Sequence, residues 1–380
     1  MNLRFESPRL QELLGAGGAS YTSRVAKRIC YIHMGPHKTG TKSIQWFLKE
    51  NRAELLKHGY FVPESGNIYG GHDSIVRQLC GQAVPDHQRL AAAKFARDLD
   101  ETSCDRVIIS SEPLAGLLRK SDYAKAFFHR IEELNLEPRL VLFVRNQSQS
   151  INSRYAEVVK GFRRSEPFEV FAREIARRPI LRYSVWIELA DAFHAELVPR
   201  AFTTATITDG IVPEFLRSIG VDPSQFPDTN VRRNEAPGPF TVSVARQVLC
   251  LIRSPGKQLK WLQAERCKTR LATYLREKGL ADAGYHGLNT ELAQHIEREL
   301  RSDNDMFSQR LWERPWAEIF AADIGQEFTP NDFDVCRPGW FTAQRLRRAV
   351  REMKAIADEI LRDRALAVDT PWNDLRQRSG

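Results

Sequence analysis

The sequence lacks any apolar run of about 18 residues, the length that a membrane-spanning helix needs. Its first 20 residues, MNLRFESPRLQELLGAGGAS, also lack the uninterrupted apolar stretch of a secretory signal peptide, because charged residues interrupt them. We therefore expect a protein without a transmembrane segment that works in the cytoplasm.

Cysteine and histidine patterns for disulfides or metal binding are missing as well. The 6 cysteines lie far apart without a CxxC pair, and no histidine cluster has zinc-ligand spacing. No cluster of carboxylates marks a Mg²⁺ site. Scattered cysteines in a chain of 380 residues are typical of reduced thiols, so we expect neither a disulfide framework nor a metal.

The composition is that of a globular protein with a basic surplus. Hydrophobic residues make up 42% and charged residues 27% of the chain, which could form one large domain or two smaller ones. Lys and Arg outnumber Asp and Glu by 56 to 48, a formal net charge of +8 that suits an anionic ligand, a nucleic acid or an acidic polymer. The basic cluster from Arg345 to Arg351 has helical spacing and is interpreted as a solvated helix face.

Three short apolar runs predict buried strands. RICYIHM stops at Gly35, RVIIS ends at Ser110, and RLVLFV ends before Arg145. None of them alternates cleanly, as is typical of parallel strands that are covered on both faces. Each run is followed by a helical segment, and HAELVPRAF near residue 200 is a further strand candidate. This alternation predicts an α/β protein with a doubly wound parallel sheet flanked by helices.

The character of the sequence changes along the chain and suggests three parts. Residues 1–27 are interpreted as a leader, 28–235 as the α/β core, and 236–380 as a mostly helical C-terminal part that follows a Gly/Pro break. Ligands of doubly wound sheets bind beyond the carboxyl ends of the strands. We expect the Gly35 loop, Glu112 and Arg145 to emerge there.

The segment from Gly35 to Ser43, GPHKTGTKS, predicts a loop that binds phosphate or sulfate. A helix is expected over TKSIQWFLKENRAELLKHG, so its backbone N–H groups and the positive end of its dipole face the loop. Lys38 adds a positive charge, and the hydroxyls of Thr39, Thr41 and Ser43 add donors. Simple helix capping is the alternative interpretation of such a loop.

A P-loop nucleotide kinase is a second interpretation, although the loop departs from the pattern G-x-x-x-x-G-K-[ST]. Gly35 and Gly40 have the required spacing, whereas Thr41 stands at the lysine position and Lys42-Ser43 follows one residue late. The second strand also ends in Ser-Ser-Glu rather than in the Asp that such enzymes use around Mg²⁺. A metal-dependent kinase is therefore the weaker alternative.

The stretch IHMGPHKTGTKSIQ resembles the 5′-phosphosulfate loop of sulfotransferases that use 3′-phosphoadenosine 5′-phosphosulfate (PAPS), particularly their bacterial and carbohydrate branch. The family core P-x-K-[ST]-G-T-[TS] is matched by Pro36, Lys38, Thr39, Gly40 and Thr41. Lys42 departs from this core, where the family has Thr or Ser, and Ser43 is its candidate substitute. The resemblance implies that this loop binds the donor, with His33 and His37 flanking and supporting it.

A second motif of the same family lies at the end of a later strand. There an Arg and a Ser eight positions later bind the 3′-phosphate of PAPS, and RLVLFVRNQSQSINSRY supplies Arg145 and Ser153 at that offset. The resemblance covers residues 28–235 and also implies a basic loop over the 3′-phosphate. Arg232 and Arg233 are the candidates for it, with two solvated loop arginines as the alternative.

The resemblance implies a P-loop-like fold and metal-independent, in-line transfer of a sulfuryl group from PAPS to a hydroxyl or amine, leaving 3′-phosphoadenosine 5′-phosphate (PAP). Lys38 is expected to neutralise charge at the bridging oxygen. Glu112 is the candidate general base and His72 its rival. The expected acceptor is a carbohydrate or a lipid-linked sugar, not a nucleic acid. A non-catalytic protein that binds PAPS or a polyanion is the remaining alternative.

Overall fold

A five-stranded, all-parallel sheet in the order β2-β3-β1-β4-β5 forms the centre of the protein. The structure is a computed structural model, and it describes residues 26–35, 39–64, 70–226, 229, 236–253, 259–363 and 366. The α/β class with a parallel sheet, predicted from the sequence, is confirmed. Within these residues, no helix has both the length and the apolar character needed to cross a bilayer.

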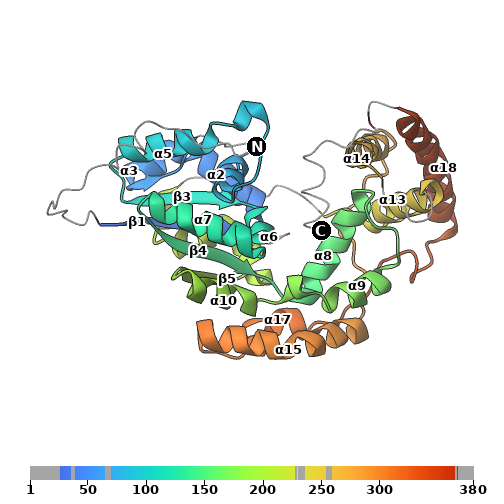
Figure 1. The fold of residues 1–380 in the computed structure, drawn as a ribbon. Coiled ribbons are helices and arrows are strands. Elements are labelled where there is room, and N and C mark those ends of the chain that lie inside the picture. The colour runs from blue at the N-terminus through green and yellow to red at the C-terminus, as the bar shows by residue number, and fades with distance from the viewer. Residues whose placement is uncertain are drawn as a thin grey trace, which may run out of the picture.

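The strands and helices alternate through the first half of the chain, as Figure 1 shows. The strands are β1 (Arg28–Met34), β2 (Tyr60–Phe61), β3 (Arg106–Ser111), β4 (Leu136–Val144) and β5 (Glu196–Ala201). The helices up to β5 are α2 (Thr41–Glu50), α3 (Arg52–Lys57), α4 (Asp73–Leu79), α5 (Ala91–Glu101), α6 (Leu114–Leu118), α7 (Ser121–Glu133), α8 (Gln147–Lys160), α9 (Phe168–Ala176) and α10 (Ser184–Ala192).

The second half of the chain is helical over its described residues. Its helices are α11 (Thr204–Asp209), α12 (Ile211–Ser218), α13 (Pro239–Ile252), α14 (Trp261–Glu277), α15 (Thr290–Trp312), α16 (Trp316–Ile319), α17 (Ala321–Ile324) and α18 (Trp340–Arg362). Short 3₁₀ turns lie at Asp86–Gln88, Pro179–Leu181 and Pro223–Gln225.

The apolar runs of the sequence form strands. Their burial explains why apolar and polar residues do not alternate along them. From Cys30 to Met34 every residue of β1 is buried, and so is every residue of β4 from Leu140 to Val144. Successive side chains of a strand point to opposite faces, so a strand covered on both faces needs apolar residues throughout. The strand candidate near residue 200 is β5, whereas β2 has two residues and leaves no pattern in the sequence.

The helix expected to follow Gly40 is interrupted at Asn51, which separates α2 from α3. Asn51 leaves helical geometry, with φ −104° and ψ 18°. Its side chain Nδ2 donates to the carbonyl of Phe47 at 3.1 Å, and its backbone N–H donates to the same carbonyl at 2.9 Å. An asparagine that bonds to nearby backbone in this way competes with continuation of the helix.

Two hydrophobic clusters cover the two faces of the sheet. On one face Ile32 and Met34 of β1 pack with residues of α4, α5, α6 and α7. On the other face Tyr31 of β1 and Ile108 of β3 pack with residues of α2, α3 and α12. The carboxyl end of β1 therefore lies between two packed layers.

A third hydrophobic cluster joins α8 and α9 to α13, α14 and α18, beside the sheet in Figure 1. Helix α15 takes part in two clusters: Leu292 and Ile296 belong to this one, and Phe307 belongs to the sheet cluster together with Trp316. Hydrophobic contacts thus cross position 236, where a domain boundary was proposed, and the boundary stays a prediction. Residues 1–25 of the proposed leader lie outside the described part.

Candidate functional site

The carboxyl ends of β1, β3 and β4 lie next to one another, because β1 is the middle strand of the three. From β1 the chain continues toward β2 on one side of the sheet, and from β4 it continues toward β5 on the other. The direction of winding therefore changes between β1 and β4, where such sheets bind ligands. Gly35, Glu112 and Arg145 directly follow these three strands, so the structure brings together the strand ends predicted from the sequence.

The first turn of α2 offers backbone donors to an anion. Gly40 precedes the helix with φ 72°, and its carbonyl accepts from the amides of Ser43 at 2.9 Å and Ile44 at 3.4 Å. The amides of Thr41 and Lys42 have no acceptor within the helix. In the described part of the chain no side chain caps this terminus, and its first turn contains no acidic residue. The positive end of the helix dipole is therefore available to a ligand.

Close packing of Gly35 against Thr41 shapes the start of the loop. A Cβ atom on Gly35 would come within 2.7 Å of Thr41 Cγ2 and nearer still to Oγ1, so a larger residue does not fit. Thr41 is 5% exposed, and its Oγ1 has no hydrogen-bond partner among the described residues. A buried hydroxyl without a partner costs about 1–3 kcal/mol, and a ligand oxygen at this atom would remove that cost.

The other loop residues differ in their placement. Thr39 and Ser43 are buried, whereas the side chain of Lys42 is exposed. Five predicted ligand contacts lie outside the described residues: Pro36, His37, Lys38, Arg232 and Arg233.

Glu112, the candidate base, is half-buried after β3 and lies close enough to the end of β1 to influence His33. Burial lowers the pKa of His33 to about 3, and the charge of Glu112 acts in the opposite direction. Nδ1 of His33 lies 2.8 Å from Ser110 Oγ, and the rings of Phe143 and Phe215 flank the imidazole at 5.8 and 5.5 Å. Nε2 is buried without a partner among the described residues, and His33 is neutral near pH 7.

His72, the rival base, is fully buried and engaged at both ring nitrogens. The backbone N–H of Ser110 donates to its Nδ1 at 3.0 Å, and Nε2 donates to the carbonyl of Pro63 at 3.0 Å. These partners assign the proton to Nε2. Burial lowers the pKa of His72 to about 4. The arrangement is that of a histidine that holds the fold together.

Asp73 is a carboxylate near the strand ends that the sequence reasoning did not select. It is the first residue of α4, and its Oδ1 accepts a hydrogen bond from Ser111 Oγ at 2.8 Å. Its position directly after His72, a candidate base, was the one feature of the sequence that pointed to Asp73. Ser111 is thereby oriented toward α4 at the end of β3.

Arg145 is anchored where β4 meets α8. Its Cζ lies 5.5 Å from the centroid of the Phe202 ring. The hydroxyl of Tyr183 donates to the carbonyl of Arg145 at 2.8 Å and accepts from its backbone N–H at 3.1 Å. Burial lowers the pKa of Arg145, although the guanidinium remains protonated at every ordinary pH. The residue is therefore a fixed positive charge at the end of β4.

Asp323 of α17 is the acidic neighbour of Arg145. It is 5% exposed, and Thr204 Oγ1 donates to its Oδ1 at 3.0 Å. Burial raises the pKa of Asp323, whereas the Thr204 hydrogen bond and the charge of Arg145 lower it. The charge of Asp323 in turn raises the pKa of Arg145, against the larger effect of burial. Asp323 is distant from Arg145 in sequence, so no local motif could have identified it.

Ser153 lies half-buried on α8, and the start of this helix is fixed by α15. Asn146 caps α8, and its Nδ2 donates to Glu297 Oε1 at 2.6 Å. Gln147 and Asn304 form a reciprocal amide pair, with N···O distances of 2.5 and 3.1 Å. Helix α15 therefore fixes the start of α8, the helix that carries Ser153.

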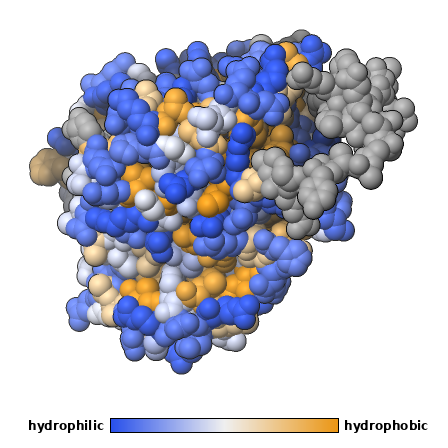
Figure 2. All heavy atoms as spheres, turned by 90° about the vertical axis from the view of Figure 1, so that its left-hand side faces the viewer, coloured by the Kyte–Doolittle hydropathy of each residue, from blue (hydrophilic) through white to orange (hydrophobic). Residues whose placement is uncertain are grey.

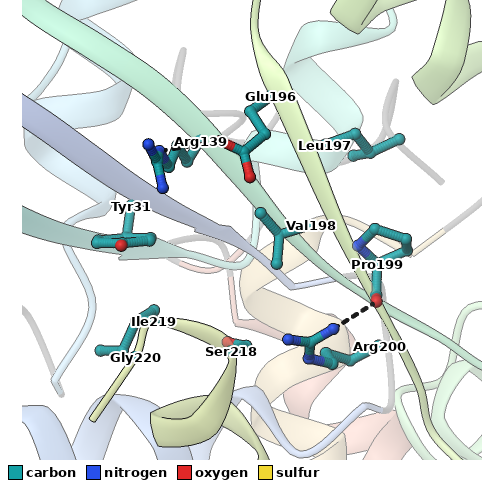
Figure 3. A pocket seen from close by; sticks show the side chains of 10 residues that line it. All are labelled: Tyr31, Arg139, Glu196, Leu197, Val198, Pro199, Arg200, Ser218, Ile219 and Gly220. Carbon is teal, nitrogen blue, oxygen red and sulfur yellow. Dashed lines mark hydrogen bonds and ion pairs between the residues drawn. The ribbon is translucent and has the colours of Figure 1, made fainter. Parts of the chain in front are cut away.

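The hollow in Figure 3 lies elsewhere, along the edge strand β5. It is lined by Tyr31, Arg139, Glu196, Leu197, Val198, Pro199, Arg200, Ser218, Ile219 and Gly220. Its arginines already have acidic partners, since Arg139 pairs with Glu196 at 3.0 Å and Arg200 pairs with Glu214 at 3.5 Å. We assign the candidate site to the strand ends, because the buried Thr41 hydroxyl and the first amides of α2 lie there, whereas both arginines of the hollow are already paired with carboxylates.

Comparison with known proteins gives no match: no protein-family model, no curated protein and no solved structure aligns significantly with the chain. Function is therefore inferred from the residues that meet at the carboxyl edge of the parallel sheet.

Proposed function

We propose that this protein is a PAPS-dependent sulfotransferase with a P-loop-like nucleotide site at the carboxyl ends of β1 and β4. The observation that carries the proposal is the pairing of Gly35 with Thr41, which leaves a buried, unpaired hydroxyl at the N-terminus of α2. The resemblance of the surrounding loop to the phosphosulfate loop of sulfotransferases identifies the ligand class.

Four features support an anionic nucleotide as the ligand. Thr41 Oγ1 can donate to a phosphate or sulfate oxygen, and the amides of Thr41 and Lys42 point out of the first helical turn. Arg145 supplies a forked positive charge suited to a terminal phosphate. Ser153 is a donor on the helix that follows Arg145. The first two features suit the 5′ side of PAPS, and Arg145 with Ser153 suits its 3′-phosphate.

Bound PAPS supplies the reactive sulfuryl group: its bridging S–O bond breaks as the acceptor oxygen bonds to sulfur, and PAP leaves. The N-terminus of α2 holds the negative charge of the transferred oxygens in a fixed orientation. Glu112 accepts the proton of the acceptor hydroxyl at its carboxylate. In this proposal Lys38 neutralises charge at the bridging oxygen. A carbohydrate or a lipid-linked sugar is the proposed acceptor.

The alternatives make different demands on the same residues. A nucleotide kinase would place Lys42 at the phosphates, but that side chain is exposed on α2. A non-catalytic PAPS-binding protein would share the nucleotide site and lack turnover. Binding of the nucleotide and transfer of the sulfuryl group must therefore be measured separately.

Transfer of label from radioactive PAPS tests the proposal. The full chain is incubated with labelled PAPS and a panel of oligosaccharides, glycolipids and amines, and the products are separated by chromatography. We expect label in at least one acceptor class with wild type and with Glu137→Gln, a matched control because Glu137 is exposed at the start of β4. Glu112→Gln should abolish transfer. PAP binding without transfer to any acceptor would support the binding protein instead.

A further inference from the structure

Helix α18 begins with two aromatic side chains that face solvent. Trp340 is 68% exposed and Phe341 is 77% exposed, the largest fractions among the exposed large hydrophobic side chains of the described residues. The two rings contact each other edge to face, with centroids 4.9 Å apart. Solitary exposed hydrophobic residues are ordinary on protein surfaces, but a contacting aromatic pair is more often part of an interaction site.

The aromatic pair lies outside the buried face of α18. That face is formed by Leu346, Ala349, Val350 and Met353, which pack into the helical cluster with α13 and α14. With 3.6 residues per turn, Trp340 lies on the opposite side of the helix from them. Packing within the described chain therefore does not require an aromatic residue at this position.

Exposed arginines lie on the same side of the helix as the aromatic pair. They are Arg345, Arg347, Arg348 and Arg351. Two nearby carboxylates are already engaged, since Glu352 pairs with Arg348 at 2.7 Å and Asp334 pairs with Arg246. The solvent face of α18 therefore combines an aromatic tip with a positive stripe; we refer to Trp340, Phe341, Arg345, Arg347 and Arg351 as the aromatic–basic surface.

We propose that the aromatic–basic surface docks on a bilayer that contains anionic phospholipid. Trp and Phe side chains at such a surface enter the headgroup region, where an amphipathic indole is favoured. The arginines can lay their aliphatic stems along the bilayer while their guanidinium groups reach the lipid phosphates. An anionic leaflet attracts each such arginine, which strengthens binding roughly fivefold per residue.

The charge of this surface suits an anionic bilayer. Glu352 and Asp334 are already paired with arginines, so the arginine row keeps a positive surplus that complements the negative charge of an anionic leaflet. Helix α18 lies at the right of Figure 1, and on the opposite face, which Figure 2 shows, the hydrophobic residues lie in small groups among hydrophilic ones.

The proposal is independent of the sulfotransferase assignment, because no residue of the candidate nucleotide site lies on α18. A failure to transfer sulfate would leave it unaffected, and a failure to bind vesicles would leave the nucleotide site unaffected. If both proposals hold, an acceptor attached to a lipid would be met at the surface where the protein docks.

Vesicle flotation with the full chain tests the proposal. Vesicles of phosphatidylcholine alone are compared with vesicles that also contain phosphatidylglycerol, at low and high salt. We expect binding to the anionic vesicles only, weakened by salt. Trp340→Ser/Phe341→Ser should reduce affinity by roughly tenfold or more because apolar burial is lost. Arg347→Gln/Arg351→Gln should reduce it by roughly 25-fold.

Matched controls separate the proposed surface from general stickiness and net charge. Leu90→Ser removes an apolar side chain that is 65% exposed on another part of the molecule. Arg89→Gln/Arg97→Gln removes two exposed charges, one just before α5 and one within it. Both controls should bind like wild type. All substitutions are at exposed positions, and thermal unfolding checks that each variant folds. Quenching of tryptophan fluorescence by brominated lipid supplies a second readout. The difference in quenching between wild type and Trp340→Phe reports on Trp340.

Several results would overturn the proposal. Equal binding to neutral and anionic vesicles, or equal binding by wild type and the aromatic variant, would exclude this surface as the contact. A dimer in light scattering that the aromatic variant dissolves, without vesicle binding, would assign the surface to a second copy of the chain. Tight binding to an oligonucleotide in place of vesicles would assign it to nucleic acid.

Discussion

Gly35 and Thr41 are packed so closely that a methyl group on Gly35 would overlap the threonine side chain. Their contact joins the end of β1 to the first turn of α2, and it holds the Thr41 hydroxyl in a buried position without a partner among the described residues. Buried polar groups are normally completed by a protein group, an ordered water, an ion or a ligand, so this hydroxyl is a candidate ligand contact. The predictions below separate the contribution of this pair to ligand binding from its contribution to stability.

Gly35→Ala should weaken PAP binding by about tenfold or more, because the new methyl group must displace Thr41. Overpacking of this kind also lowers the free energy of unfolding, by about 1–3 kcal/mol. Calorimetric titration and thermal unfolding measure the two effects. Gly339→Ala is the control, since a Cβ there meets open space. Unchanged PAP affinity in Gly35→Ala would show that the loop does not hold the nucleotide.

Thr41→Val should separate binding from stability. The substitution removes the unpaired Oγ1 and keeps the shape, so the free energy of unfolding should stay the same or rise. PAP affinity should fall by about tenfold, because a hydrogen bond to a charged ligand is worth about 1.5–3 kcal/mol.

Thr204→Val is the matched comparison for this experiment. The Thr204 hydroxyl donates to Asp323, so its loss should lower the free energy of unfolding by about 1 kcal/mol or more. If Thr41→Val were destabilised to the same extent and bound PAP normally, the hydroxyl would serve the fold and not a ligand.

Substitution of Glu112 should affect sulfuryl transfer, whereas substitution of His72 should affect stability. Glu112→Gln should abolish sulfuryl transfer and leave PAP affinity within about twofold of wild type, because the base acts on the acceptor. His72→Ala should lower the free energy of unfolding by about 2–4 kcal/mol, since it removes hydrogen bonds to Ser110 and Pro63 and leaves a cavity. Full turnover by Glu112→Gln would mean that another group takes the proton.

The stability of the protein should fall as the pH is lowered below about 6.5. His33 and His72 are buried with pKa values lowered to about 3 and about 4, so the folded protein leaves both neutral while the unfolded chain takes up protons. Between pH 6.5 and 5 the two histidines should together remove about 3 kcal/mol from the free energy of unfolding.

Urea unfolding at a series of pH values measures this loss. His72→Gln should reduce the pH dependence by about half, since one of the two buried imidazoles is gone. His129→Gln is the control, because that imidazole lies in a side chain that is 70% exposed. A free energy of unfolding that stays constant over this range would contradict the burial of these two groups.

A fragment that ends at residue 235 should fail to fold cooperatively. It lacks α15, whose Glu297 and Asn304 hold the start of α8, and it lacks Trp316 of the sheet cluster. Buried amides left without partners cost about 1–3 kcal/mol each, and the exposed cluster adds to the loss. Circular dichroism during thermal unfolding measures cooperativity, with a chain ending at Leu366 as the control. Cooperative unfolding of the shorter fragment would show that residues up to 235 form an independent domain.

Local patterns in the sequence were enough to predict the parallel sheet and the place of the candidate site. The strands could be predicted because burial on both faces of the sheet requires apolar runs. The candidate site could be located because each run is followed by a glycine or a polar residue. The electrostatic interaction of Arg145 with Asp323 and the hydrogen bond of Asn146 with Glu297 could not be predicted. Such pairs join segments that are distant in sequence, and a single chain carries no local signal of them.

Two smaller departures also have physical causes. The break of the first helix at Asn51 depends on a side-chain hydrogen bond that competes with helix continuation, which helical periodicity does not reveal. The structural role of His72 depends on its burial against the backbone of Ser110 and Pro63. A histidine on a glycine-rich loop has the same sequence signature whether it serves the fold or a substrate.

Calorimetric titration with PAP, beside ATP with Mg²⁺, tests the central claim most directly, with wild type and Arg145→Ala compared. We predict that wild type binds PAP tightly without metal and more tightly than ATP with Mg²⁺, and that Arg145→Ala loses roughly tenfold or more in PAP affinity because a charge-assisted pair to phosphate is removed. Absence of PAP binding, or a preference for ATP with Mg²⁺, would contradict the sulfotransferase proposal and favour the kinase.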